Sequence, residues 1–105
     1  MLCKDFAYKG LLKCFETVSS IPRPSFHEEK IAQYLCAFAK ERGLEYLCDE
    51  KNNVLIRLGA SLGREEDSPL LLQGHTDMVC EKNDGVEIDF SRTPYRYVQI
   101  GRAHV

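Results

Sequence analysis

Apolar residues recur at helical spacing near the beginning of the chain. Residues 5–20 place four apolar side chains on one helical face: Leu11, Leu12, Phe15 and Val18. This stripe is typical of an amphipathic helix, although Gly10 weakens its start by roughly 1 kcal/mol of helix propensity. The run Ile21-Pro22-Arg23-Pro24 ends the helix, because proline lacks a backbone donor and disfavours helical backbone at the preceding residue.

A second helix is marked at both ends. Ser25 and Glu28 read as a capping box, in which Ser25 accepts from the amide three residues on and Glu28 reaches back. The apolar face of this helix has four members: Ile31, Tyr34, Leu35 and Phe38. Its last turn carries Lys40 and Arg42, and Gly43 is the predicted left-handed cap.

Beyond the second helix the pattern becomes that of strands. Residues 44–48 and 54–58 are two short strand candidates around a polar turn at 49–53. A polar loop, 59–68, separates them from residues 69–73, which are apolar at successive positions. A strand covered on both faces has this pattern, usually in the middle of a sheet. The order of elements predicts an α/β fold, with two helices followed by strands of a mixed central sheet.

Composition narrows the class of protein. A chain of 105 residues with 44% hydrophobic residues has the size of one small domain with a modest core. The net charge of -2, without a basic cluster, argues against a nucleic-acid partner. No apolar run approaches a membrane span of ~20 residues, and we expect no signal peptide. Five cysteines without a CxxC pair favour a reduced, cytoplasmic setting: Cys3, Cys14, Cys36, Cys48 and Cys80.

Candidate chemistry follows directly after the apolar run 69–73. In open α/β sheets ligands collect at the carboxyl ends of strands, and this is where Gly74 and His75 lie. With a strand period of two, His75 and Asp77 project to the same side. A neutral imidazole is a common ligand of zinc, and a neighbouring carboxylate fixes its tautomer and raises its basicity.

Structural interpretations stand beside this one. A His-x-Asp at a strand end is usually a hydrogen-bonded structural pair, and one imidazole with one carboxylate cannot complete a tetrahedral zinc site. Cys80 is either a third ligand or, as we favour, a small buried thiol. His27, in the first turn of the second helix, is interpreted as a partly exposed structural residue. The acidic run Glu65-Glu66-Asp67 is interpreted as a solvated loop.

Two stretches of the chain carry a family resemblance. They read SIPRPSFHEE at residues 20–29 and LLQGHTDMVCEKN at residues 71–83. Both resemble the amino-terminal part of the aminoacyl-histidine dipeptidases, also called Xaa-His or cytosol non-specific dipeptidases. These belong to the two-zinc aminoacylase and carboxypeptidase-type metallopeptidases. The resemblance runs from Phe15 to Tyr97, and the second stretch is much more specific than its H-x-D core.

The resemblance implies a fold, a reaction and two site residues. The fold would be an incomplete, N-terminal part of a zinc-peptidase-like catalytic domain. His75 would be a metal ligand and Asp77 the catalytic aspartate that orients it, in a full-length site with two Zn²⁺ ions, or Co²⁺ or Mn²⁺. The substrates would be Xaa-His and other short dipeptides, and the full-length protein could be a homodimer. The other ligands and the glutamate base would lie further along, so this chain would be inactive alone.

The last six residues suggest a different origin. Ile100 to Val105 are the translation of a widely used sequencing-library adapter, ATC GGA AGA GCA CAC GTC, which is followed by the stop codon TGA. The preceding adapter bases fit a CAG codon for Gln99. We interpret residues 100–105 as adapter read-through, against the alternative of a natural tail, and so exclude His104 as a ligand. Residues 1–99 would be the truncated native part, with 13 basic and 16 acidic residues.

One alternative comes from another functional class. A small, non-enzymatic α/β interaction or regulatory domain could keep the His-x-Asp motif as structure. Such a domain should fold cooperatively alone, whereas a fragment of an enzyme should expose the faces of its central strand and aggregate.

Overall fold

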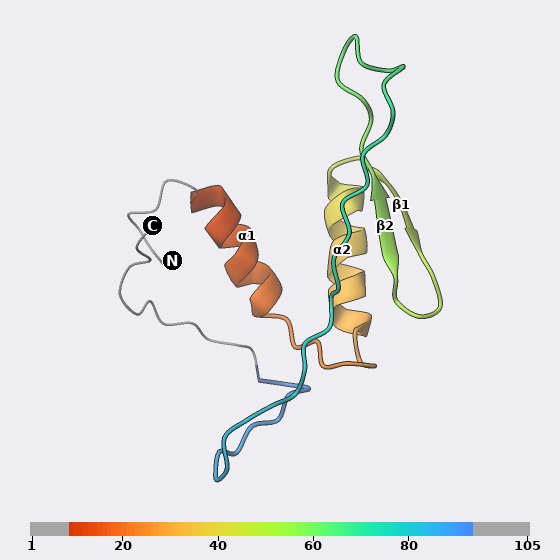
Figure 1. Cartoon of the computed structure of the whole chain (residues 1–105). Coiled ribbons are helices and arrows are strands. Elements are labelled where there is room, and N and C mark those ends of the chain that lie inside the picture. Colours follow the sequence, from red (N-terminus) through yellow and green to blue (C-terminus); the bar gives the residue numbers. More distant parts are fainter. Residues whose placement is uncertain (1–8, 94–105) are drawn as a thin grey trace.

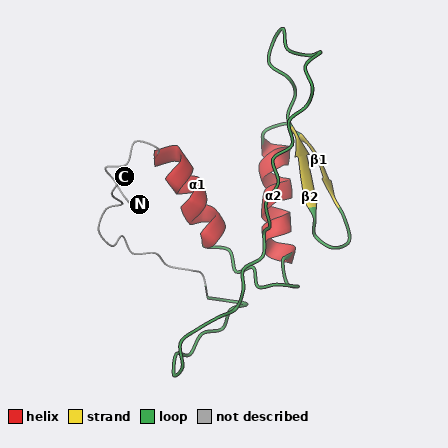
Figure 2. Ribbon diagram, viewed as in Figure 1, coloured by secondary structure: helices red, strands yellow, loops and turns green. Residues whose placement is uncertain are grey.

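The computed structural model describes residues 9–93, which form two helices and one hairpin (Figures 1 and 2). The elements are α1 (Lys9–Ser19), α2 (Glu29–Glu41), β1 (Glu45–Cys48) and β2 (Val54–Arg57). Both predicted helices and both strands predicted around the polar turn are therefore confirmed within these residues, and the two strands pair as a hairpin. Cys3 and the interpreted adapter tail, 100–105, lie outside the described part of the chain.

The apolar stripe of α1 forms as the spacing predicts, but it is only partly covered. Leu11 is 69% exposed and Phe15 is 51% exposed. Helix α1 ends at Ser19, one residue before the run Ile21-Pro22-Arg23-Pro24. The sequence pattern thus predicts the helix, but it does not predict how far the apolar face of the helix is buried.

The predicted capping box at the start of α2 is wrong. The residue before the helix is Glu28, and it makes no side-chain capping hydrogen bond. Phe26 has a left-handed φ of 70° and lies in a tight turn, in which the His27 amide donates to the Pro24 carbonyl. This turn places Ser25 outside the helix, so the Glu28 carboxylate accepts from the Phe26 amide at 2.8 Å instead.

Gly43 ends α2 as predicted. Its φ is 66°, in the left-handed region that glycine adopts without steric cost. The Gly43 amide donates to the Lys40 carbonyl and the Leu44 amide to the Ala39 carbonyl, which is the Schellman pattern. This reversal directs the chain into β1, so that the hairpin returns along the helix (Figure 1).

The hairpin is antiparallel, and a single carboxylate organises its turn. Tyr46 is the register partner of Ile56. At the turn, Asp49 Oδ1 accepts from the amides of Lys51 and Asn53, both at 2.9 Å, and Oδ2 accepts from the Asn53 side chain at 2.8 Å. Asn52 supplies the left-handed backbone, with a φ of 65°, which asparagine tolerates better than most residues.

This turn should respond to acid. The hydrogen bonds from Asn53 hold the pKa of Asp49 below its ordinary value of 3.8. A lowered folded-state pKa means that the stabilisation is complete above the ordinary value and is lost as the pH falls through the lowered one. We expect the Asn53 amide resonance in NMR spectra to titrate with a midpoint below 3.8, and Asp49→Asn to abolish that step. A midpoint at or above the ordinary value would contradict these bonds.

The core of the described residues lies where α2 packs against both strands. Its fully buried apolar side chains are few: Ile31, Ala32 and Ala39. Two alanines on this face allow the hairpin to approach the helix closely. Neither described helix is long and apolar enough to cross a lipid bilayer.

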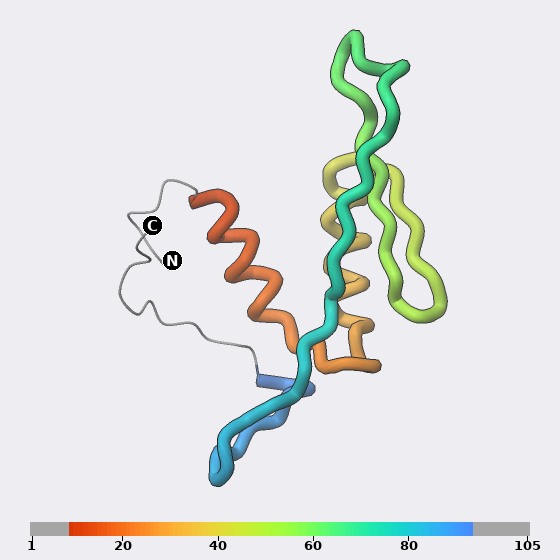
Figure 3. Tube along the Cα trace, in the orientation of Figure 1, coloured from red at the N-terminus to blue at the C-terminus, as the bar shows by residue number. Residues whose placement is uncertain are grey.

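The predicted buried strand at 69–73 is not formed. Leu70, Leu71 and Leu72 are 85%, 75% and 85% exposed, and the segment runs as an extended coil (Figure 3). In the described residues the sheet contains β1 and β2 alone. A strand covered on both faces needs paired edges and packed layers around it, and residues 9–93 do not provide them for this run.

Candidate functional site

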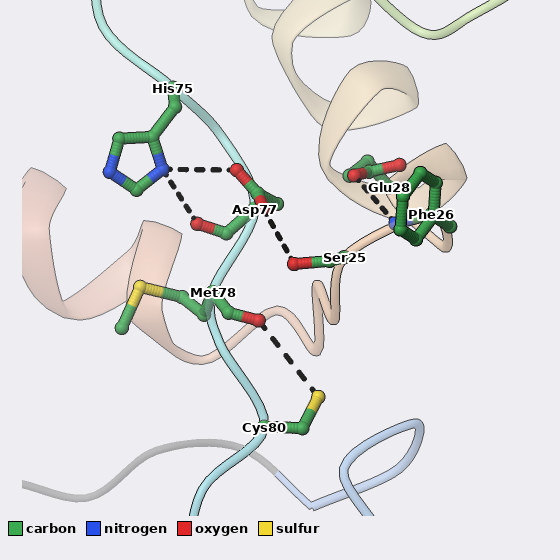
Figure 4. A network of polar contacts seen from close by, with 7 residues as sticks. All are labelled: Ser25, Phe26, Glu28, His75, Asp77, Met78 and Cys80. Carbon is green, nitrogen blue, oxygen red and sulfur yellow. Dashed lines mark hydrogen bonds and ion pairs between the residues drawn. The ribbon is translucent and has the colours of Figure 1, made fainter.

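Two segments far apart in sequence meet at the site. The Met78 amide donates to the Arg23 carbonyl at 2.9 Å, and Pro24 and Met78 form an isolated parallel bridge. Pro24 is buried, and its fixed φ stiffens this stretch of backbone. This short parallel pairing sets Ser25 opposite Asp77 (Figure 4).

His75 and Asp77 form a close pair, as their spacing predicts. His75 Nδ1 lies 3.0 Å from Asp77 Oδ1 and 2.9 Å from the Asp77 backbone oxygen. Carboxylate and carbonyl oxygens only accept hydrogen bonds, so Nδ1 must carry the proton that both of them face. The neutral ring then holds its lone pair on Nε2, and Figure 4 shows this edge of the ring turned away from Asp77.

The second oxygen of the same carboxylate is held from the other side. Ser25 donates its hydroxyl proton to Asp77 Oδ2 at 2.6 Å in a partly buried contact. The Ser25 hydrogen bond, and after it the His75 bond, hold the pKa of Asp77 below its ordinary value. The Asp77 side chain is 34% exposed and that of His75 is 77% exposed, so the carboxylate is the more sheltered partner.

A cavity of about 640 Å³ borders this pair. On one side its wall is the hairpin turn, with Asp49 and Asn53, and on the other it is the segment from Gln73 to Asp77. Glu28 completes the rim near α2. The volume lies within the ~300–1,000 Å³ of small-ligand sites, so the space beside His75 is large enough for a short peptide.

The donor set fits part of a metal site. His75, with its Nδ1 bound to a carboxylate and its Nε2 available, has the arrangement of a metal-binding imidazole. However, residues 9–93 contain no cluster of three or more histidine, cysteine, aspartate or glutamate side chains that could hold a metal ion. The described residues therefore fit one ligand and its orienting carboxylate, and they do not fit a complete zinc site.

The other candidate residues do not join the His75–Asp77 pair. Cys80 is exposed, so its interpretation as a buried thiol is wrong, and its Sγ lies 3.9 Å from the Met78 carbonyl oxygen. His27 is exposed and lies just before α2 rather than in its first turn. The acidic run at 65–67 is exposed loop, as predicted, with Asp67 paired to Arg64.

Ser25 is the site residue that the sequence pattern assigned elsewhere. Its hydroxyl contacts a carboxylate 52 positions away, a separation at which periodicity carries no information. The local signal, a serine three residues before a glutamate, pointed to a capping role instead. The only hint was its position after the run with two prolines, where regular structure stops.

Two known proteins are similar to this chain. The chain is 44% identical over 80 residues, 76% of its length, to the cytosol non-specific dipeptidase of Escherichia coli (strain K12). Its structure is similar to the crystal structure of aminoacylhistidine dipeptidase from Vibrio alginolyticus, with a TM-score of 0.79 and 38% identity over 86% of the chain. No protein-family model matches the chain.

The chain spans only a small part of these relatives. It covers 16% of the Escherichia coli protein and 18% of the Vibrio alginolyticus chain. The structural match shows that the two helices and the hairpin are a piece of a peptidase domain fold, as the resemblance predicts. Sequence and structure thus agree that the chain belongs to the aminoacylhistidine and cytosol non-specific dipeptidase family, of whose members it spans less than a fifth.

Proposed function

We propose that this chain is a segment of a metal-dependent dipeptidase that hydrolyses Xaa-His and other short dipeptides. The observation that carries the proposal is the hydrogen bond from His75 Nδ1 to Asp77, because it leaves Nε2 as the ligating nitrogen. The two relatives, one named for aminoacylhistidine and one for non-specific dipeptides, support the substrate class. They also favour this function over a non-enzymatic interaction domain.

In the proposed site His75 acts as a metal ligand through Nε2, and Asp77 is the catalytic carboxylate that orients it. Asp77 holds the proton on Nδ1 and makes the imidazole a more basic ligand. The pair would contribute to a site for two Zn²⁺ ions, or for Co²⁺ or Mn²⁺. When bound, such ions polarise a scissile carbonyl and lower the pKa of water.

The chain's own residues would also bind the substrate. A short peptide would lie in the cavity beside His75, between the hairpin turn and the segment from Gln73 to Asp77 that line it. The remaining metal ligands and the general base would come from parts of the whole protein that this chain does not include. The chain alone is therefore expected to be inactive, and the whole protein is proposed to be cytoplasmic and a homodimer.

A hybrid enzyme tests this function. The 80 matched residues of the Escherichia coli dipeptidase are replaced by their counterparts from this chain, and hydrolysis of a Xaa-His dipeptide is measured. We expect hydrolysis by the hybrid and none by the isolated chain. A hybrid with the helical content of its parent but without hydrolysis would contradict the proposal, as would an isolated chain that cleaves the dipeptide.

A further inference from the structure

We propose that Ser25 is a positioning residue that holds the Asp77 carboxylate in the orientation that binds His75 Nδ1–H. Ser25 acts through Asp77 and His75. The importance of this role for catalysis rests on the proposed function, but the role itself is a property of the three side chains described here.

The geometry assigns one partner to each carboxylate oxygen. Oδ2 accepts from the Ser25 hydroxyl at 2.6 Å, and Oδ1 faces His75 Nδ1 at 3.0 Å. The shorter distance is typical of a hydroxyl that donates to an ionised carboxylate. Because a serine hydroxyl carries a single proton, this bond uses the whole donor capacity of Ser25.

Without this bond the carboxylate would be held on one side only. The last torsion of an aspartate is broad and roughly two-fold, so a free carboxylate samples many orientations. The His75 contact is exposed, whereas the Ser25 contact is partly buried, and water therefore competes more strongly at the histidine. Ser25 is thus the more protected of the two hydrogen-bond anchors of the Asp77 carboxylate.

The backbone keeps Ser25 in place for this role. The bond from the Met78 amide to the Arg23 carbonyl and the bridge between Pro24 and Met78 fix the register of the two segments. The Arg23 guanidinium also donates to the Val18 carbonyl near the end of α1. Ser25 therefore lies on a backbone segment that belongs to neither helix and is held in place by these contacts (Figure 4).

The test is the tautomer of His75 in the 105-residue chain, measured from ¹⁵N shifts of the imidazole ring at a pH where the ring is neutral. We expect the Nδ1–H form to predominate. Ser25→Ala should lower the ratio of Nδ1–H to Nε2–H, by at most about fivefold, the effect of one typical hydrogen bond, because the Asp77 backbone oxygen at 2.9 Å also faces Nδ1. Ser25→Thr keeps the hydroxyl and should keep the ratio, as should Ser68→Ala in the exposed loop.

Circular dichroism of each variant reports whether its helices persist. If Ser25→Ala loses helix, Ser25→Cys replaces it, because a thiol fills similar space but donates only weakly. An unchanged ratio in whichever variant keeps its helices would overturn the proposal, and so would a wild-type chain in which Nε2–H predominates. No metal or substrate is added, so this outcome is independent of the hybrid-enzyme result.

Discussion

His75→Ala in the hybrid dipeptidase is expected to lower kcat/KM for a Xaa-His dipeptide by about 10³-fold or more. The substitution removes the only imidazole of the Asp77 pair, and metal-assisted charge stabilisation contributes several kcal/mol to the barrier, about tenfold in rate for each 1.4 kcal/mol. The fold should persist, because the His75 side chain is 77% exposed in this chain, so its truncation removes no packing.

The matched control is His27→Ala. His27 is also an exposed histidine, and it lies outside the pair, so its substitution should leave kcat/KM within about twofold, as surface changes usually do. If both substitutions changed kcat/KM only slightly and to the same extent, a role for His75 would be contradicted. If both substitutions lowered kcat/KM strongly and also lowered the helical content, the cause would be a loss of folding instead. Circular dichroism separates a folding effect from an effect at the site.

Asp77→Asn is expected to weaken zinc binding by the hybrid about 10- to 100-fold, the usual effect of removing the carboxylate that orients a metal-bound histidine. Asparagine keeps the shape but has one accepting oxygen, for which the donors of Ser25 and His75 would compete. Calorimetric titration with Zn²⁺ measures the change.

Asp84→Asn provides the control for this loss of charge, because Asp84 is an exposed aspartate in a turn and is not a member of the pair. Its zinc affinity should match that of the unmodified hybrid. The role assigned to Asp77 would be contradicted if both asparagine variants bound zinc as tightly as the parent hybrid.

The local elements could be predicted from the sequence, because their causes are local. The stripes of α1 and α2 and the left-handed cap at Gly43 depend on residues within a few positions of one another. The hairpin was predictable for the same reason, since a polar stretch separates two short apolar runs and Asp49 bonds to residues two and four positions away.

Two of the failed predictions depended on distant partners. Leu70 to Leu72 have the composition of a buried strand, but burial requires neighbours on both faces and both edges, which residues 9–93 do not supply. Ser25 satisfies a local capping pattern, but the turn at Phe26 places it outside the helix, and its hydroxyl donates to the Asp77 carboxylate 52 positions away.

The His75–Asp77 pair formed although the strand that suggested it did not. The two residues are close enough in sequence for Nδ1 to reach both the carboxylate and the backbone oxygen of Asp77 without a strand. The pairing was therefore within reach of sequence reasoning. The Ser25 contact that completes it was not, since it depends on the parallel bridge between Pro24 and Met78.

Anomalous diffraction at the zinc edge from crystals of the zinc-loaded hybrid tests the central claim most directly, that His75 ligates a metal through Nε2. We expect an anomalous peak about 2.0–2.1 Å from Nε2, the usual zinc–nitrogen distance, with Nδ1 still bonded to Asp77. A peak beside Nδ1, or zinc bound elsewhere with His75 unligated, would contradict the account.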